Sequence, residues 1–392
     1  MSDRYLFFYV SALAFAGALF SLSLPLYLTQ RIGAPHYYFF IRQTTYVCFS
    51  IFLMWGLARL DPDKWVAKIG FGLFFFFFAL MFFMPFMPET IVPTINGARR
   101  WIRFGSLSVT PVEFFKVGFV FFLAWSLTRK LYRPKTGKEQ FTFARELGAI
   151  APYAAIFFVA IILIAVMQND AGQVIVLGCT MSLMIFFAGS SVKVFTSLIL
   201  FSLFMGFALI LQARHRIDRA LQWWSGVQDS ILSLLPDFIA DALRVDASVV
   251  SPAYQVTQAA HAIHHGGLMG AGLGGGVVKL GFLSDAHNDF ALAGIAEETG
   301  LFGIILVSLL ILLVIYRIFK IANRSDNPVF YLFSIGIGVM IASQFLMNAL
   351  GATGLIPIKG ISAPFLSYGG ASLVAFSVAI GLALMISKKA RI

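Results

Sequence analysis

Long apolar runs separated by short polar stretches dominate this chain of 392 residues. Runs such as 71–87 and 301–315 have no polar face. A helix needs about 20 apolar residues to cross the hydrocarbon core, because it rises about 1.5 Å per residue. Applied along the chain, this criterion predicts ten membrane-spanning helices, at 5–28, 37–58, 66–87, 111–130, 147–166, 172–190, 192–212, 289–316, 329–349 and 366–387.

The composition excludes a soluble protein. Hydrophobic residues make up 59% of the chain and charged residues only 12%, whereas soluble proteins have roughly 45–50% apolar and about 25% charged residues. The mean hydropathy of +0.86 agrees. We expect an all-α, polytopic integral membrane protein in which residues 1–392 form a single membrane domain.

Basic residues give the chain a formal net charge of +11, and most of them lie in short segments between apolar runs. These segments are 59–68, 129–145, 317–324 and 388–391. Such placement follows the positive-inside rule for cytoplasmic loops and argues against a nucleic-acid partner. We expect a protein of the cytoplasmic (inner) membrane, surrounded by membrane lipids, with both termini cytoplasmic.

This orientation places one unusually long segment, 213–288, outside the cytoplasm. Loops of such length are usually either functional or disordered. Its two adjacent tryptophans and its dense glycines are not the composition of a disordered linker. We expect a large extracytoplasmic loop with a function, although its stretch 230–251 suggests no role.

Polar side chains cluster at the outward ends of the predicted spans, and such groups are candidates for function because they are costly at membrane depth. Glu113 and Lys116 come shortly after Pro111. They are three residues apart, so they face one side of a helix. They could simply neutralise each other. Asp170, in a short turn between two spans, could likewise be an ordinary helix cap.

Segment 254–298 carries the largest polar cluster. Its glycines at 270–275 match a dinucleotide-binding pattern, but that pattern needs a preceding strand and a βαβ unit, so no nucleotide is expected. His261, His264 and His265 have a spacing that could bind a metal on a helix. Without an acidic or cysteine partner nearby in the sequence, an interfacial surface is the better interpretation.

Two acidic residues end this cluster. Asp289 opens a predicted span after glycines that let backbone approach a ligand closely, so it could be a helix cap or a reacting group. Glu298 would lie near the middle of the bilayer if Asp289 sits at the interface. The irregular segment 354–372 predicts a re-entrant or cavity-lining element, because such backbone is tolerated in a membrane only there.

Together, the segments 96–101, 254–298 and 354–372 resemble the SEDS family (shape, elongation, division and sporulation proteins), which includes the FtsW and RodA branches. The resemblance extends over nearly the whole chain in span order. Its most specific parts are the His-Asn-Asp-Phe sequence that ends at Phe290 and the Leu-Ser-Tyr-Gly-Gly sequence that begins at Leu366.

The resemblance implies a peptidoglycan glycosyltransferase that polymerises lipid II. It also implies a class B penicillin-binding protein as cross-linking transpeptidase, and other membrane proteins of the divisome as partners. The Lys-Gly pair at 359–360 is more like the FtsW branch, which acts in cell division, than like the RodA branch, which acts in elongation and cell shape.

The family's essential acidic residue falls on Asp289, its periplasmic arginine on Arg99 or Arg100, and its buried ion pair on Glu113 and Lys116. We therefore predict that Asp289 is catalytic. The predicted substrate-binding residues are Arg99, Arg100, Glu113, Lys116, Asp170, Gln258, His287, Glu298, Lys359 and Ser367.

The sequence departs from the family pattern in two places. Where the family usually has Leu-Pro-Glu-x-His-Thr-Asp, residues 283–289 read Leu-Ser-Asp-Ala-His-Asn-Asp, and where it has Pro-Asp-x-Gly-Thr, residues 169–173 read Asn-Asp-Ala-Gly-Gln. Both segments keep their acidic residue, so the departures concern finer contacts.

Extending a glycan requires the 4-hydroxyl of one sugar to attack the anomeric carbon of another, with undecaprenyl pyrophosphate leaving. A positioned carboxylate can take the hydroxyl proton. The departing pyrophosphate needs positive charge, from arginine and lysine or from a divalent cation such as Mg²⁺ or Mn²⁺. The basic candidates are Arg99, Arg100, Lys116 and Lys359.

Two other functions stay open at this point. A lipid II flippase or transporter predicts a polar path through the bilayer, for which Glu113, Lys116 and Glu298 are suggestive. A structural scaffold for the division machinery would leave Asp289 dispensable.

Overall fold

The computed structural model describes residues 2–95, 97–105, 107–131, 143–211, 214–233, 235–236, 239–241, 244–245, 254–283, 285–357 and 360–390. These residues are mostly helical, which confirms the all-α prediction. The strands named within them are β1 (Ile102–Phe104) and β2 (Leu107–Val109), which pair antiparallel with Ile102 opposite Val109.

A helix lies at each of the ten predicted spans. These helices are α1 (Arg4–Ser23), α3 (Tyr38–Arg59), α4 (Pro62–Phe83), α5 (Pro111–Lys130), α6 (Phe143–Ile161), α7 (Ala171–Phe187), α8 (Val192–Leu211), α12 (Ala291–Asn323), α13 (Pro328–Ala352) and α14 (Gly370–Ser387). In the described part of the chain, seven of these helices are long and apolar enough to cross a membrane. Helix α3 does not meet this criterion, and α7 and the apolar part of α8 are shorter than it requires. The protein is therefore a multi-pass membrane protein.

Two helix boundaries differ from the prediction for local reasons. Helix α4 begins at Pro62, because the Asp61 side chain accepts a hydrogen bond from the Asp63 amide and proline suits a first turn. Helix α14 begins at Gly370 instead of residue 366, because the preceding residues form an irregular, mostly buried loop at 361–369.

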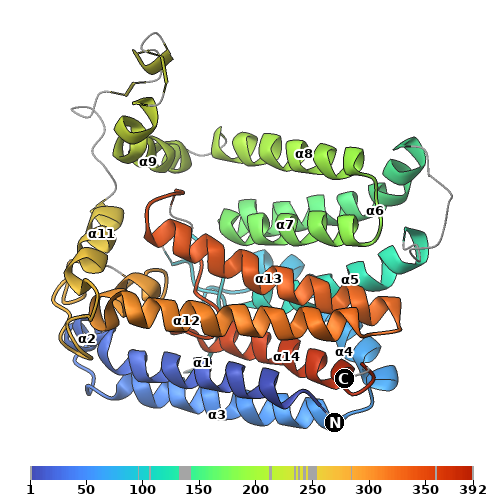
Figure 1. Cartoon of the computed structure of the whole chain (residues 1–392), viewed down its shortest axis with the longest axis horizontal. Coiled ribbons are helices and arrows are strands. Elements are labelled where there is room, and N and C mark those ends of the chain that lie inside the picture. The colour runs from blue at the N-terminus through green and yellow to red at the C-terminus, as the bar shows by residue number, and fades with distance from the viewer. Residues whose placement is uncertain are drawn as a thin grey trace.

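The helices lie roughly side by side along the long axis of the molecule (Figure 1). Helices α5, α13 and α14 are mostly buried and form the interior, whereas α4 and α12 expose most of their apolar surface. Helix α8 lies at the edge of the bundle, next to α7. That residues 1–392 form one membrane domain stays a prediction.

Glycines allow two close approaches inside the bundle. A Cβ at Gly118 on α5 would lie 2.3 Å from the backbone nitrogen of Phe74 on α4. A Cβ at Gly17 on α1 would lie 2.5 Å from the carbonyl oxygen of Phe365, in the loop before α14. A side chain at either position would force the backbones apart, so both contacts require glycine.

Both termini lie at one end of the bundle (Figure 1). The Asp3 amide donates to the Ser387 hydroxyl at 2.9 Å, and Arg317 Nε donates to Asp3 Oδ2 at 2.9 Å. Lys388 Nζ donates to the Leu60 carbonyl at 2.6 Å. The predicted basic segments around these residues therefore gather at the same end, as the positive-inside rule requires. Residues 132–142 of the segment 129–145 lie outside the described residues.

The opposite end carries the short elements. These are α2 (Leu26–Arg31), the 3₁₀ turn η1 (Met84–Phe86), β1, β2, α9 (Arg214–Leu232) and α11 (Tyr254–Gly266). Trp223 on α9 donates its indole N–H to the Gly354 carbonyl at 2.8 Å, which attaches the long loop to the end of α13. Much of the predicted stretch 230–251 lies outside the described residues.

Candidate active site

Asp289 lies at this end, in the loop just before α12. The N-cap of α12 is Phe290, which makes no side-chain capping bond, so Asp289 is not the cap of that helix. The residue is half-buried, and no described residue donates a hydrogen bond to its carboxylate. It borders a recess lined by Asp289, Phe290, Met347, Asn348, Gly351, Ala352, Gly360 and Ile361.

The backbone around Asp289 is held by side chains from α13 and from the loop before α14. Asn348 Nδ2 on α13 donates to the carbonyls of Asp289 (2.8 Å) and Ile361 (2.6 Å). The Ser367 hydroxyl donates to the Asn288 carbonyl at 2.6 Å. Since these bonds join two irregular loops to one helix, they fix the direction in which the Asp289 side chain leaves the backbone.

His287 contributes to the same frame through packing. Its ring centroid lies 5.9 Å from those of Phe39 and Tyr368, and the Tyr368 amide donates to the His287 carbonyl at 2.8 Å. Burial lowers the pKa of the His287 ring, against an opposing effect of Asp285. The positions of His287 and Ser367 thus support the loop, and their contact with substrate stays a prediction.

The electrostatic surroundings bring the pKa of Asp289 close to neutral pH. Burial, together with the carboxylates of Asp285 and Asp170, raises the pKa of Asp289 to about 7, while Arg100 and Arg219 oppose the shift. A carboxyl group with such a pKa can exchange a proton at physiological pH, which is the property required of a general base.

Arg100 and Asp170 are brought together within electrostatic range of this acid. Arg100 donates to the carbonyls of Gln168 (2.8 Å) and Asn169 (2.6 Å), and its Nη1 lies 3.5 Å from Asp170 Oδ2. These carbonyls follow the π-helical turn η2 (Ile162–Met167) that ends α6. A cation there satisfies carbonyls that have no helical partner.

Asp170 also caps α7, as the sequence suggested it could. Its side chain accepts the Gln173 amide at 3.4 Å. Burial raises the pKa of Asp170, and Arg100 lowers it. One residue therefore fixes the start of α7 and holds Arg100 near Asp289.

The structure distinguishes the two candidate arginines. Arg99 turns away from Arg100 and donates to the carbonyls of Pro85 (2.9 Å), Met87 (2.6 Å) and Val92 (3.3 Å). Its guanidinium thereby ties together the turn after α4. Arg100 is the arginine of the site, and a substrate contact by Arg99 stays a prediction without support from its position.

Glu113 and Lys116 form the ion pair that their spacing indicated. Lys116 Nζ lies 2.9 Å from Glu113 Oε2 and donates to the side-chain oxygens of Gln173 and Gln344, each at 2.7 Å. Gln173 donates back to Glu113 Oε1 at 2.8 Å. Both charged residues are buried. Gln173 bonds Glu113 through its side chain and Asp170 through its amide, so the pair supports the Asp170 cap.

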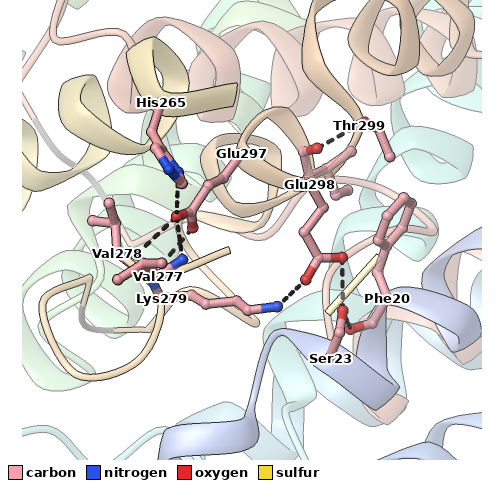
Figure 2. A network of polar contacts seen from close by, with 10 residues as sticks. Phe20, Ser23, His265, Val277, Val278, Lys279, Glu297, Glu298 and Thr299 are labelled. Atoms are coloured by element: carbon pink, nitrogen blue, oxygen red, sulfur yellow. Dashed lines mark hydrogen bonds and ion pairs between the residues drawn. The ribbon is translucent and has the colours of Figure 1, made fainter. Parts of the chain in front are cut away.

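Glu298 belongs to a separate network, on the side of α12 that faces α1 and the glycine-rich segment (Figure 2). Its Oε1 pairs with Lys279 Nζ, and its Oε2 accepts the Ser23 hydroxyl at 2.8 Å. Lys279 and Glu298 are both buried. No structural role for Glu298 was evident from its neighbours in the sequence, and this pair supplies one.

The side chain of the neighbouring Glu297 accepts hydrogen bonds from the backbone of residues 277–279. Its Oε1 accepts the amides of Val277 (2.6 Å) and Val278 (2.8 Å), and its Oε2 accepts that of Lys279 at 3.3 Å (Figure 2). His265 Nδ1 lies 3.2 Å from the same Oε1. This histidine therefore faces an acidic residue that is distant in the sequence.

The remaining predicted substrate-binding residues are Gln258 and Lys359. Gln258 is half-buried on α11, and Lys359 lies outside the described residues, so both stay predictions. Within the described residues, no three His, Cys, Asp or Glu side chains converge as ligands for a metal ion.

Sequence reasoning missed Lys279, Gln344 and Asn348. Gln344 and Asn348 are polar residues inside a predicted span, a signal that could have marked them. Lys279 follows a glycine-rich stretch in a loop, where a lysine is ordinarily solvated, so the sequence carries no such signal for it.

Known proteins are similar to this chain over almost its full length. The chain matches the model of a family described as cell cycle protein, that of FtsW, RodA and SpoVE, over residues 3–392. A Helicobacter pylori protein called probable peptidoglycan glycosyltransferase FtsW is 44% identical over 390 residues, covering 99% of this chain and 98% of that protein. A Haemophilus influenzae protein of the same name is 30% identical, and the match covers 100% of this chain and 91% of that protein.

Solved structures show the same fold. A chain from a study of how a peptidoglycan synthase complex coordinates polymerization and crosslinking gives a TM-score of 0.71 at 21% identity, covering 100% of this chain and 99% of that one. The rod shape determining protein RodA of Thermus thermophilus gives a TM-score of 0.66 at 21% identity, covering 100% and 98%.

The Glu113–Lys116 pair can be tested by comparing single and double substitution. Lys116→Met leaves the buried Glu113 charge without its cation and should destabilise the protein by about 3–5 kcal/mol. Lys116→Met combined with Glu113→Gln should recover much of this loss. The measurement is thermal unfolding of the detergent-solubilised protein. The exposed lysine variant Lys193→Met is the control, and a Lys116→Met effect no larger than this control would contradict the assignment.

Proposed function

We infer from the family to which this chain belongs, that of the FtsW, RodA and SpoVE cell cycle proteins, that it is a peptidoglycan glycosyltransferase. It polymerises lipid II into glycan strands at the outer face of the membrane. The FtsW name of the full-length relatives supports a role in septal wall synthesis during cell division, rather than in RodA-type elongation.

In the proposed mechanism Asp289 is the general base. The 4-hydroxyl of one sugar attacks the anomeric carbon of the other. As the new glycosidic bond forms, the bond to the lipid-linked pyrophosphate breaks, and Asp289 accepts the hydroxyl proton. The observation that carries this proposal is a half-buried carboxylate, within electrostatic range of Arg100, that neither caps α12 nor accepts a hydrogen bond from any described residue. Such proton transfer contributes typically about 10²–10⁴-fold in rate.

Positive charge beside Asp289 is proposed to stabilise the departing pyrophosphate. Arg100 is partly exposed and lies close enough to lower the pKa of Asp289. Oriented cations at the point where negative charge develops are an effective form of transition-state stabilisation. Lys359 stays a second candidate from the sequence. Lys116 is engaged by three buried side chains, so we assign it a supporting role.

We also propose that the reaction uses a divalent cation, Mg²⁺ or Mn²⁺. Mg²⁺ is usually held by one or two carboxylates together with substrate phosphates, so such an ion would be shared between a carboxylate of the site and the pyrophosphate. No nucleotide is needed, because the sugar donor is already activated by its lipid pyrophosphate.

As partner we propose a class B penicillin-binding protein, which would cross-link the strands, together with other membrane proteins of the divisome. Support comes from the peptidoglycan synthase complex that contains a chain of this fold. Association with a transpeptidase would place cross-linking next to polymerisation.

The alternative of a lipid II flippase loses its main motivation. The charges that suggested a polar path are neutralised in pairs, Lys116 by Glu113 and Glu298 by Lys279. The scaffold alternative differs from the proposed function in a single requirement, because it does not need the Asp289 carboxylate.

Substitution of Asp289 tests the proposal directly. Asp289→Asn keeps the size of the side chain but cannot accept the proton, so strand synthesis from labelled lipid II by the purified protein should fall at least ~10²-fold. Asp218→Asn, which removes an exposed carboxylate from α9, is the matched control and should retain activity. Near wild-type polymerisation by well-folded Asp289→Asn protein would contradict the mechanism and favour the scaffold.

The pH profile offers an independent check. Because its surroundings raise the pKa of Asp289 to about 7, the base is protonated and inactive below that value, and polymerisation should rise as the pH passes through it. Asp285→Asn removes a negative charge that raises this pKa, so its profile should shift to lower pH. An initial-rate profile that stays flat from acid to alkaline pH would count against Asp289 as the base.

We also propose an orientation, with both termini in the cytoplasm of a cell whose cytoplasmic (inner) membrane holds the protein. In a variant with Cys48 and Cys179 replaced by serine, Thr90→Cys should react with a membrane-impermeant maleimide in right-side-out vesicles. Lys64→Cys, at the basic end, should react only in inverted vesicles. The reverse pattern would overturn the orientation.

A further inference from the structure

The glycine-rich segment 267–282 exposes apolar side chains and no charge. The exposed fractions are 63% for Leu268, 77% for Met269, 69% for Leu273, 54% for Val277, 44% for Leu280 and 53% for Phe282. The one charged residue of the segment, Lys279, is 1% exposed and turns inward to Glu298. A loop in water would have the opposite arrangement.

This segment lies beside α12, well below the beginning of that helix. The amides of Ala271 and Gly272 donate to the carbonyls of Glu297 and Glu298, each at 2.9 Å, and the Leu301 amide donates to the Gly267 carbonyl at 3.0 Å. Since α12 begins at residue 291, the contact lies about 9–15 Å along the helix from its outer end.

Glycine makes this contact feasible. Gly300 has a φ of 66° and interrupts α12, and a Cβ there would lie 2.4 Å from the Gly270 nitrogen. A Cβ at Gly270, whose φ is 81°, would lie 2.2 Å from the Glu298 carbonyl oxygen. The two backbones therefore touch, and the helix is broken where the segment crosses it.

The depth of this crossing can be compared with the thickness of the hydrocarbon layer. Arg317, at the basic end of the same helix, marks the opposite boundary. Between it and Gly300 the helix rises about 25 Å, which is less than the hydrocarbon thickness of about 30 Å. From Gly300 toward Arg317, α12 presents an apolar exposed face that includes Leu301, Phe302 and Leu306.

Two carboxylates of α12 satisfy the lysine of the segment and three of its amides. Glu297 accepts the three consecutive amides of residues 277–279, and Glu298 neutralises the Lys279 ammonium (Figure 2). Water would hydrate an exposed amide or ammonium at no cost, whereas in lipid each must have an internal partner. Two buried carboxylates from one helix meet that requirement for the ammonium and for these three amides.

We propose that segment 267–282 is a membrane-inserted loop, whose exposed apolar side chains contact the acyl chains of the outer leaflet in continuity with the lipid-facing surface of α12. The sequence had placed this segment wholly outside the membrane, within 213–288. The loop joins α11 to the Asp289 segment, so its contact with lipid holds the site at a set height above the acyl chains. The inference is independent of the reaction that the site performs.

Depth-dependent quenching tests the proposal in the full-length protein. In the cysteine-free variant, Met269→Cys is labelled with bimane and reconstituted into vesicles of phosphatidylcholine brominated on the acyl chains. Leu306→Cys, on the lipid-facing side of α12, is the positive control, and Thr90→Cys, on an outer turn, is the aqueous control. We expect brominated lipid to quench the bimane fluorescence at position 269 at least half as strongly as that at position 306. Aqueous iodide should quench the label at position 269 several-fold less than the label at position 90.

Quenching of Met269 by iodide but not by brominated lipid would overturn the proposal and show a surface exposed to water or reserved for a protein partner. Quenching by neither reagent would also overturn it, since the label would then be covered by protein. Leu268→Cys, exposed on the same segment, provides a second label position if Met269→Cys fails to fold, and the same two outcomes apply to it.

Discussion

A charge buried in a membrane protein needs an opposite charge or several hydrogen bonds close by, and this requirement organises the whole molecule. Each internal ion pair joins segments that lie far apart in the sequence or stabilises a contact between helices. The pair in α5 recruits glutamines from α7 and α13, while the pair on α12 attaches the glycine-rich loop and, through Ser23, also α1. The pairs with at least one buried partner include Glu113–Lys116, Asp170–Arg100, Glu297–His265, Glu298–Lys279 and Asp3–Arg317.

Asp289 stands out against this background because its backbone is bonded, whereas its carboxylate accepts no hydrogen bond from a described residue. Asn348 and Ser367 hold the chain on either side of it, and Arg100 is fixed nearby by carbonyls at the end of α6. A reacting group on a rigid frame loses little orientational freedom when substrate binds. Both loops in this frame are irregular, and the side chains of Asn348 on α13 and Ser367 satisfy three of their carbonyls.

The helices could be predicted well from the sequence, because an apolar run of about twenty residues is rarely anything but a membrane-spanning helix. The ion pair at i, i+3 and the cap at Asp170 could also be predicted, since each of these depends on neighbours in the sequence. The role of Asp289 rests on the family resemblance and stays a prediction. Arg99 and Arg100 could not be distinguished, because the two differ only in the direction of their side chains. Nor could the partner of Glu298 be found, since Lys279 reaches that carboxylate only after the glycine-rich segment folds back on α12.

The contacts of Asp3 have a practical consequence for labelling this protein. Asp3 caps α1, is bonded to Ser387 and pairs with Arg317, so the two ends of the chain meet beside a single helix. Fluorophores fused to the two ends would lie within energy-transfer range of each other while the bundle is intact. Loss of transfer would then report separation of α1 from α14, in living cells and without any assay of wall synthesis.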